Sequence, residues 1–348
     1  MKKILSMAAL ALIMAGCSND EETPEINPGE VTNAVPVQIS QKVAGVETKA
    51  AVTLGSEMTA NIIMVDAGSG STDSPDFSAF SPITANTFGD AASGGGKELK
   101  TDAARANVAT ATFKADANAT GIKLNPTLYY PVSDKSKKTW ILGVAPQGVV
   151  DQTKVNFNDV DGLQDVMYAT KIEGTGQNAS TKIDLEFKHQ TTQLLFVAKF
   201  VAGTDLSTTE WKGKTVSVTS IEIPNAQVPN AINIKDGTLE CIEKKLTVAG
   251  CKEALKETAC AKSVPVMIKA SSSLVVNLVL KVGDETVTYS NLEVKKAQGT
   301  ESLVTVAGKS HLITFEITAP VGSDQAQVGA TAKVVDWTVG DEGKVEIK

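Results

Sequence analysis

Histidine is the side chain most often used for proton transfer and metal binding near neutral pH. This chain of 348 residues contains two, His189 and His311, and each lies within or beside a stretch with the alternating pattern of a strand. A catalytic or metal-binding histidine needs partners at close range, and the spacing of the sequence suggests none. We therefore predict structural roles for both histidines.

Two further stretches carry residue types that could bind a ligand. The run of three glycines and a lysine at 94–97 looks like a phosphate-binding loop, but Glu98 occupies the position that needs serine or threonine. Asp66, Asp73 and Asp76 lie in a stretch rich in glycine and serine and could bind calcium, although their spacing does not match an EF-hand loop. Solvated loops are the better interpretation of both. We predict no catalytic residue, no metal and no cofactor, and a protein that is not an enzyme.

Cysteine offers a third kind of chemistry, and the chain has four. Cys17 stands alone near the N-terminus, which leaves Cys241, Cys251 and Cys260. Three is an odd number, so at most one disulfide can form within the chain. No pair has the C-x-x-C spacing typical of zinc sites. Either one pair bridges a loop or all three are unpaired, and the sequence does not decide between these alternatives.

The surroundings of Cys17 indicate a modification. Two lysines, an apolar run from Ile4 to Met14 and two small residues form a secretory signal peptide. This ending is similar to the bacterial lipobox, with methionine at the position where leucine is usual. We predict that residues 1–16 are removed and that Cys17 becomes the first mature residue and carries acyl chains such as palmitate. More than one such chain gives stable membrane attachment.

The composition of the rest of the chain narrows its range of partners. Residues 17–34 are acidic and contain two prolines, which predicts a flexible tether. The net charge is −7, and the single arginine, Arg105, lies in a stretch that we interpret as a flexible loop. No basic stripe is visible, so nucleic acid is not expected as a partner. No apolar run after Met14 approaches the roughly 20 residues that span a bilayer, which leaves the lipid on Cys17 as the expected anchor.

Short alternating patterns of apolar and polar residues begin near residue 35. Val35, Val37 and Ile39 alternate with other residues and predict a short strand. This strand should begin at a sheet edge, because Pro36 cannot donate a ladder hydrogen bond. Residues 41–49 are mostly polar and predict a loop. At the C-terminus we predict a hairpin whose strands contain Val335, Trp337, Val339, Val345 and Ile347.

The fold class follows from the many short strands. Turn residues recur roughly every 8–12 residues, and no stretch after the signal peptide keeps a helical period. This indicates an all-β protein, most simply two β-sandwiches. The pattern is interrupted between Glu173 and Ser180, so we predict an N-terminal domain at 35–178 and a C-terminal domain at 179–348.

Several segments, taken in order, resemble the fimbrillin family of lipoprotein pilins from Gram-negative bacteria, a type V pilin-like family. One is the segment from Asp184 to Phe200, where a Phe-x-His sequence connects two apolar strands. The others are Leu128–Pro131 followed by Trp140–Pro146, Asp165–Ala169, and Val335–Gly340. Together with the lipobox-like N-terminus, these segments extend the resemblance over nearly the whole chain.

Membership would imply two transthyretin-like β-sandwich domains and assembly into surface fimbriae that serve adhesion. In that family a lipidated precursor reaches the outer membrane, and a protease, often arginine-specific, removes the N-terminal strand. The groove left behind accepts a strand from another subunit, commonly from its C-terminus. The resemblance therefore implies other copies of this chain and other fimbrial subunits as partners, together with the maturation protease and a ligand on a host or bacterial surface.

The family's functional segments map onto particular residues of this sequence. The removable strand contains Val35, Val37 and Ile39. Cleavage would fall after Lys49, so that Ala50 becomes the new N-terminus. The candidate donor strand lies in the C-terminal hairpin, with Val335, Trp337, Val339, Val345 and Ile347. Burial of three apolar side chains contributes roughly 1.5–3 kcal/mol each, so loss of the first strand would remove a large part of a domain's stability.

One departure from the family pattern leaves alternatives open. Stalk subunits often have arginine after the first strand, whereas this chain has Lys49. Either a lysine-tolerant protease cuts there, or the chain stays uncut and serves as a lipid-bearing anchor subunit or a tip subunit. The competing class is a surface glycan-binding lipoprotein, with Trp211 as the one candidate aromatic platform. The C-terminal hairpin favours a polymerising pilin, which is the function we predict.

Overall fold

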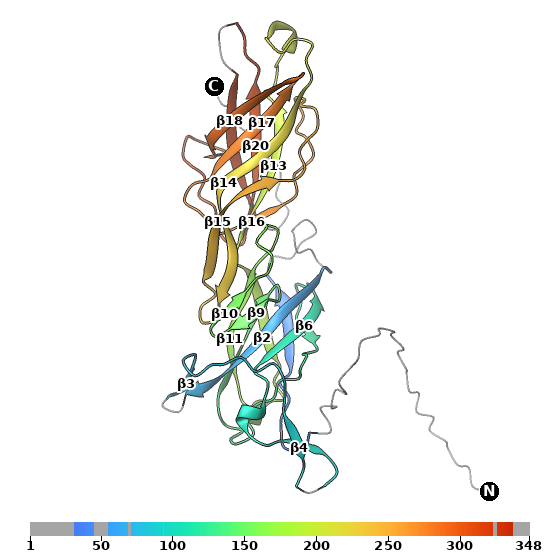
Figure 1. Ribbon diagram of the computed structural model, residues 1–348, viewed down its shortest axis with the longest axis vertical. Coiled ribbons are helices and arrows are strands. Elements are labelled where there is room, and N and C mark those ends of the chain that lie inside the picture. The colour runs from blue at the N-terminus through green and yellow to red at the C-terminus, as the bar shows by residue number, and fades with distance from the viewer. Residues whose placement is uncertain (1–30, 45–54, 69–70, 93, 323–325, 337–348) are drawn as a thin grey trace, which may run out of the picture.

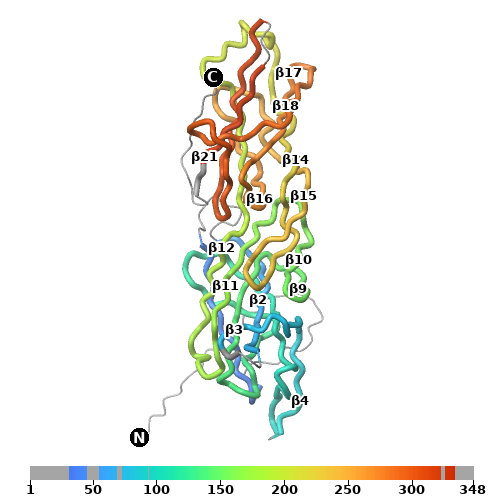
Figure 2. The backbone as a smooth tube through the Cα atoms, turned by 90° about the vertical axis from the view of Figure 1, so that its left-hand side faces the viewer, coloured from blue at the N-terminus to red at the C-terminus, as the bar shows by residue number. Residues whose placement is uncertain are grey.

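The computed structural model describes residues 31–44, 55–68, 71–92, 94–322 and 326–336. They form an elongated molecule in which two β-rich halves lie end to end (Figure 1, Figure 2). Apart from three short 3₁₀ turns, the regular structure of these residues is all strand, which confirms the predicted all-β class. Within the same ranges, no helix has the length and apolar character needed to cross a membrane.

The first half is built around one eight-stranded sheet with the order β3-β2-β8-β11-β12-β1-β7, in which β6 also pairs with β2. All seven residues of β8 are buried, as expected for a central strand covered on both faces. Gly143 in β8 makes room for the ring of Phe187 from β12, since a Cβ atom there would lie 2.5 Å from that ring. The elements of this half are β1 (Ile39–Val43), β2 (Glu57–Gly68), β3 (Ser71–Pro75), β4 (Phe88–Asp90), β5 (Lys97–Leu99), η2 (Asp102–Ala104), β6 (Val108–Lys114), β7 (Thr120–Ile122), β8 (Thr139–Ala145), β11 (Met167–Gly174), η3 (Gly176–Asn178) and β12 (Ile183–His189).

The second half is a sandwich of two sheets. One has the order β18-β17-β14-β10-β9, with β15 also paired to β14, and the other has the order β16-β13-β20-β21-β19. β13 and β20 run parallel, and their rings Phe196 and Phe315 stack between the sheets with centroids 6.1 Å apart. β9 (Val149–Asp151) and β10 (Lys154–Asn156) belong to the first of these sheets but lie beside the first half (Figure 1). The elements of the second half are β13 (Thr192–Phe200), η4 (Leu206–Thr208), β14 (Val216–Asn233), β15 (Leu239–Val248), β16 (Val266–Ile268), β17 (Val275–Val282), β18 (Glu285–Glu293), β19 (Lys295–Lys296), β20 (Lys309–Thr318) and β21 (Gln327–Asp336).

The long strand β14 ties the two halves together. Its first part pairs with β17, and its last residues pair with β10, where Asn233 lies opposite Lys154. Ile232 and Ile234 are fully buried there, in a cluster that includes Tyr168 of the first sheet. The hydroxyl of Tyr168 also donates to the carbonyl oxygen of Ile234 at 2.9 Å. The halves therefore share a hydrophobic core as well as a strand.

The first strand differs from its prediction in position and in length. It runs from Ile39 to Val43, so the predicted loop is wrong for its first three residues. β1 is also not an edge strand, because β12 lies on one side of it and β7 on the other. The predicted strand ended before Gln41 because this residue is polar, but its side chain is completely buried and the strand continues through it.

The predicted domain division at residues 178 and 179 stays a prediction. β12 follows that point in the sequence, yet it pairs with β1 and β11 in the first sheet. β13, which begins at Thr192, is the next strand and lies in the second half. The interrupted pattern near residues 174–180 therefore corresponds to the connection between two antiparallel strands of one sheet.

We predict that Ile232→Ala lowers the free energy of unfolding by about 2–5 kcal/mol, because it leaves a cavity in the core that the halves share. Urea unfolding followed by fluorescence, with Trp140 reporting on the first half and Trp211 on the second, should show one shared transition. Ile242→Ala is the matched control, since this side chain is 39% exposed and its loss should change stability by about 0.5 kcal/mol or less. Two separate transitions, of which the Ile232 variant shifts only one, would contradict this coupling.

Candidate strand-exchange site

β1 lies between two strands and pairs with both. It runs parallel to β12 over its whole length, with Ile39 opposite Ile183, and its first three residues run antiparallel to β7. Just before the strand, the backbone nitrogen of Val37 donates to the carbonyl oxygen of Leu128 at 2.9 Å, which extends the ladder on the β7 side. Removal of residues 35–43 would therefore leave unpaired backbone groups on both sides of a gap in the sheet.

The side chains of this segment belong to the core of the first half. Val37, Ile39 and Val43 are 6%, 3% and 2% exposed and share one cluster with Phe187 of β12. Val35 is partly buried against the same cluster. The structure thus places the three predicted residues of the first strand on one apolar face, while their removal by a protease stays a prediction.

Gln41 is a residue of this site that the sequence interpretation missed. It shares the inward face of β1 with Ile39 and Val43. Its amide nitrogen donates to the carbonyl oxygen of Lys114 and to the hydroxyl of Thr120, both at 3.0 Å, but its amide oxygen has no partner among the described residues. A buried acceptor without a partner costs about 1–3 kcal/mol, so this strand is not the best possible occupant of its place. Extending the alternation past the polar residue would have found it.

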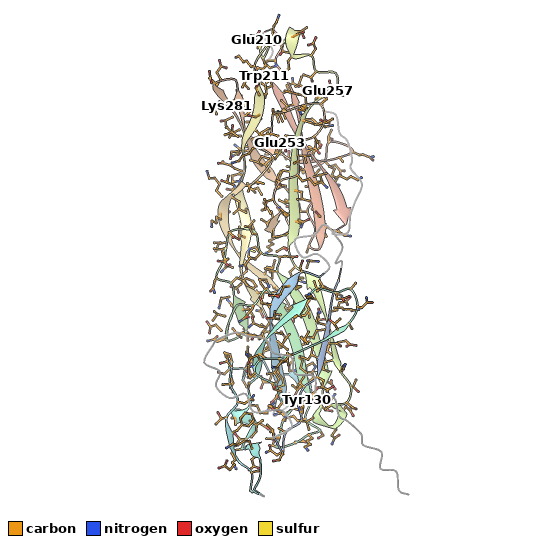
Figure 3. All side chains as sticks on the ribbon, turned by 90° about the vertical axis from the view of Figure 1, so that its right-hand side faces the viewer. Tyr130, Glu210, Trp211, Glu253, Glu257 and Lys281 are labelled. Carbon is orange, nitrogen blue, oxygen red and sulfur yellow. The ribbon has the colours of Figure 1, made fainter. Side chains whose placement is uncertain are left out.

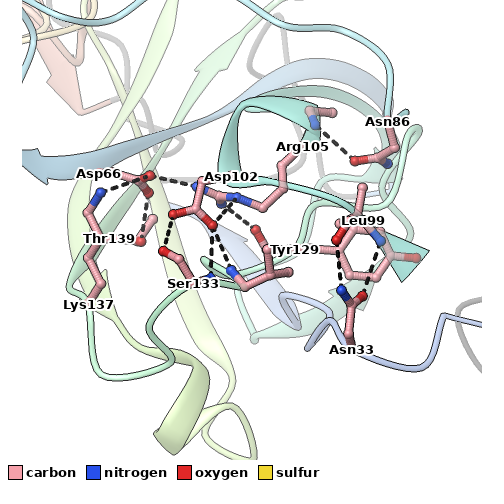
Figure 4. A network of polar contacts seen from close by, with 12 residues as sticks. Asn33, Asp66, Asn86, Leu99, Asp102, Arg105, Tyr129, Ser133, Lys137 and Thr139 are labelled. Atoms are coloured by element: carbon pink, nitrogen blue, oxygen red, sulfur yellow. Dashed lines mark hydrogen bonds and ion pairs between the residues drawn. The ribbon is translucent and has the colours of Figure 1, made fainter. Parts of the chain in front are cut away.

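Arg105 braces the backbone that pairs with the residues before β1 (Figure 4). Its side chain is 4% exposed; Nη1 donates to the carbonyl oxygen of Tyr129 at 2.7 Å, and Nη2 donates to Asp66 at 2.6 Å. Nε lies 3.8 Å from Asp102. Tyr129 forms a β-bridge with Pro36, so the arginine fixes the backbone against which the start of the first strand lies.

The predicted flexible loop around Arg105 is wrong. Asp102 is itself held in place, accepting hydrogen bonds from the backbone nitrogen of Val132 at 2.8 Å and the hydroxyl of Ser133 at 2.5 Å. Burial raises the pKa of Asp102, but these hydrogen bonds outweigh it and the pKa is lowered from its usual value. The two strongest partners of Arg105 lie 24 and 39 residues away along the chain, which is why local composition did not reveal them.

The carboxylates considered for calcium binding are engaged separately. Asp66 forms an ion pair with Arg105 at 2.6 Å, and Asp73 forms one with Lys138 at 2.9 Å. Asp76 accepts hydrogen bonds from its own turn. Over the described ranges, no group of three or more histidine, cysteine, aspartate or glutamate side chains is placed to hold a metal ion. The geometry therefore gives the calcium alternative no support.

Both histidines are buried. His189 lies at the end of β12, where its Nδ1 is 2.9 Å from Asp165 and the hydroxyl of Thr191 donates to the same carboxylate at 3.3 Å. His311 in β20 accepts a hydrogen bond from the backbone nitrogen of Val306 at 3.4 Å, and burial lowers its pKa to about 4. Both positions fit structural roles. Asp165 was not identified as a partner because it precedes His189 by 24 residues.

Trp211 does not form the aromatic platform that the glycan-binding alternative requires. Its side chain is 5% exposed and packs against Phe200, with ring centroids 6.4 Å apart. Figure 3 places it near the far end of the second half, close to Glu210. Glu210 and Lys212 are exposed, and the prediction that Trp211 is exposed rested on these charged neighbours.

Several predicted site residues lie outside the described part of the chain. They are the predicted lipid-bearing Cys17, the predicted cleavage residues Lys49 and Ala50, and the donor residues Trp337, Val339, Val345 and Ile347. The fifth donor residue, Val335, is described, and it lies in β21 with its backbone opposite Ser310.

The fold is all-β, with two halves end to end and β1 inserted between two strands of the first sheet (Figure 1). The model of a family described as fimbrillin-like matches residues 75–337, and the chain belongs to this family. The predicted resemblance is thereby confirmed. Fimbrillins are structural subunits of cell-surface fimbriae, so the chain has a structural and not an enzymatic role, and other fimbrial subunits are its partners.

Several solved structures are similar to this chain at low sequence identity. A candidate cell adhesion protein from Bacteroides uniformis is 18% identical, with a TM-score of 0.48 over 88% of this chain and 98% of its own. A fimbrial assembly protein from Parabacteroides distasonis is 10% identical, with a TM-score of 0.43 over 87% and 99%. The tip fimbrial protein Mfa3 from Porphyromonas gingivalis, truncated at its C-terminus, is 7% identical, with a TM-score of 0.39 over 87% and 100%. A comparison with curated proteins finds no match.

We predict that Arg105→Leu lowers the free energy of unfolding by about 2–4 kcal/mol, because it leaves the Tyr129 carbonyl oxygen and the Asp66 carboxylate without their buried donor. Lys137→Leu is the matched control. This lysine also faces Asp66, at 3.8 Å, but it is 35% exposed, and its loss should change stability by about 0–1 kcal/mol. Urea unfolding of both variants measures the difference. Equal effects would contradict a bracing role for the arginine.

Proposed function

We propose that this chain is a fimbrial subunit that polymerises by exchanging its first strand. The precursor is held in the outer membrane by lipid on Cys17, and a protease cuts between Lys49 and Ala50. The strand is then removed, and the C-terminal strand of another subunit fills the gap between β12 and β7 by β-augmentation. The observation that carries the proposal is the two-sided pairing of β1, since another strand must take its place if it leaves.

The size of the gap explains why a donor is needed. Val37, Ile39 and Val43 are almost fully buried, and such side chains contribute roughly 1.5–3 kcal/mol each on burial. Their loss removes about 5–9 kcal/mol before any compensation, against the roughly 5–15 kcal/mol that stabilises a whole domain. Backbone groups of both neighbouring strands lose their partners as well. A cut subunit is therefore unstable until a neighbour supplies a strand.

Gln41 favours replacement of the first strand by an apolar donor strand. In the uncut chain its buried amide oxygen has no partner among the described residues. An apolar donor side chain at this position would remove that penalty of about 1–3 kcal/mol. The two acceptors of the Gln41 amide belong to Lys114 and Thr120, which are exposed residues at the end of β6 and the start of β7. A strand with uninterrupted apolar alternation would thus bind more tightly than the one it replaces.

The C-terminal segment carries short apolar stretches that could supply the donor strand. β21 pairs with β20 as far as Asp336, opposite Lys309. The 12 residues at 337–348 follow, with one apolar pair, Trp337 and Val339, before the turn-type residues at 340–343 and a second pair, Val345 and Ile347, after them. At about 3.3 Å per residue, the five residues 344–348 alone would extend about 17 Å, which is the length of a five-residue strand such as β1.

Lys49 supports one alternative to the polymerising subunit. If no protease accepts lysine at this position, the first strand stays in place and the chain keeps its lipid. Such a subunit could donate a strand but not accept one, and it would serve as an anchor or tip at the end of a fibre. The glycan-binding lipoprotein has no comparable support, because the platform residue Trp211 is buried.

Material from the cell surface, run on a gel with and without boiling, tests the proposal when the N-terminus of each band is determined. We predict a heat-sensitive ladder whose bands begin at Ala50, and loss of this ladder in Lys49→Gln, because the uncut strand blocks the gap. Lys42→Gln is the matched control, since this lysine of β1 is 41% exposed and pairs with Glu186 at the surface. A single wild-type band that keeps lipidated Cys17 would contradict strand exchange and favour the anchor or tip subunit.

A further inference from the structure

Two cysteines of the second half lie against each other. Cys251 and Cys260 are both in the connection between β15 and β16, and their thiol groups form a hydrogen bond. Cys251 is 4% exposed within the core of this half, and Cys260 packs against the same core. Cys241 lies on β15 and packs against a different cluster. The three cysteines are thiols in this structure, and the geometry brings together one pair of them.

The backbone of β13 holds this pair in place. The backbone nitrogen of Ala198 donates to the sulfur of Cys260 at 3.2 Å, and the backbone nitrogen of Cys260 donates to the carbonyl oxygen of Ala198 at 3.0 Å. Further along, the backbone nitrogen of Phe200 donates to the carbonyl oxygen of Lys256 at 2.8 Å. β16 pairs with the first three residues of β13 only, so the connection supplies the ladder for the rest of that edge.

This connection covers an edge that would otherwise be open. Unpaired backbone groups on the edge of a sheet are a template for strands of other chains. In a protein that assembles by strand exchange, a second open edge would accept donor strands at the wrong place. Residues 249–265 form no regular strand of their own, and Cys251 has a positive φ of 53°. The connection is held on β13 by separate backbone hydrogen bonds to Phe196, Ala198 and Phe200 and not by a continuous strand.

The contact between the two thiols also sets their reactivity. The hydrogen bond from Cys251 lowers the pKa of Cys260 to about 7, and the same contact raises the pKa of Cys251. Cys260 is thus the better thiolate near neutral pH, and the thiolate is the form that attacks a disulfide. Because Cys260 is partly exposed, an oxidant can reach it.

We propose that Cys251 and Cys260 form a disulfide after export, and that this bond locks the connection along the edge of β13. The Cys260 thiolate attacks one sulfur of an external disulfide, carried by a protein or a small molecule, and one thiol leaves. Cys251 then loses its proton and attacks the Cys260 sulfur, which releases the second thiol. Two S–H bonds become one S–S bond, and two electrons and two protons convert the oxidant into two thiols. The disulfide rests on the export that the proposed function includes.

Peptide mapping tests the bond directly. Cleavage after lysine separates the three cysteines into peptides 236–244, 246–252 and 257–262. Protein from the cell surface should be alkylated before lysis and digested with trypsin without reduction. We expect peptide 246–252 joined to 257–262, with peptide 236–244 alkylated. Alkylation of both 246–252 and 257–262, or a link that includes 236–244, would overturn the proposal.

Stability measurements test whether the bond locks the structure. For the purified chain oxidised with glutathione disulfide, reduction or the Cys251→Ser substitution should lower the melting temperature by about 5–10 °C, since a closed ring of 10 residues is opened. Cys241→Ser is the matched control and should leave the melting temperature and the peptide link unchanged. An oxidised and linked protein that melts at the same temperature as the reduced one would contradict the locking role.

The fimbrial ladder distinguishes failure of this inference from failure of the proposed function. Free thiols at 251 and 260 in material whose bands begin at Ala50 would reject the disulfide and leave strand exchange standing. A linked pair in a protein that keeps lipidated Cys17 and forms no ladder would support the disulfide and reject strand exchange.

Discussion

The hydrogen bonding of one short strand on both of its sides is the constraint on which the first half depends. β1 joins β12 to β7, and its apolar side chains lie in one cluster with those of the strands around it. A sheet cannot leave interior backbone groups unpaired, so some strand must occupy this place. Backbone pairing is the same for any sequence, and a replacement needs only the right alternation of apolar side chains. The sheet therefore needs a strand between β12 and β7, but that strand can have a different sequence from β1.

Under the proposed function, the remaining structure keeps this one place available for exchange and covers the other edge. Arg105 anchors the backbone beside the start of the first strand, and the buried core around Ile232 joins the two halves into one body. The connection that carries Cys251 and Cys260 covers the edge of β13. A fibre subunit needs a rigid scaffold with one acceptor position, because a second accepting edge would lead to branching or aggregation. The elongated arrangement of the halves suits such a subunit (Figure 1).

Alternation of apolar residues was enough to predict the all-β class and the apolar face of the first strand. It failed where a polar side chain takes a buried position, as with Gln41, whose partners come from other strands. The predictions for Arg105 and Trp211 were wrong for the same reason. Partners that are distant in sequence bury these side chains, although their neighbours in sequence are polar. The position of β12 was not predictable either, because a parallel pairing with β1 joins residues 144 apart and leaves no local signal. Sequence patterns report local periodicity, whereas the candidate exchange site is made by contacts between distant segments.

The most direct test identifies which strand lies beside β7 in assembled fimbriae. Gly121 of β7 is opposite Ser40 of β1, and no atom lies within 4 Å of a Cβ atom built there, so a photo-reactive side chain can be introduced at this position. After irradiation of purified fimbriae, mass spectrometry should show residue 121 linked to a peptide from residues 337–348 of a neighbouring copy. A link to residues 35–43 of the same chain, in subunits within the fibre, would contradict strand exchange at this site.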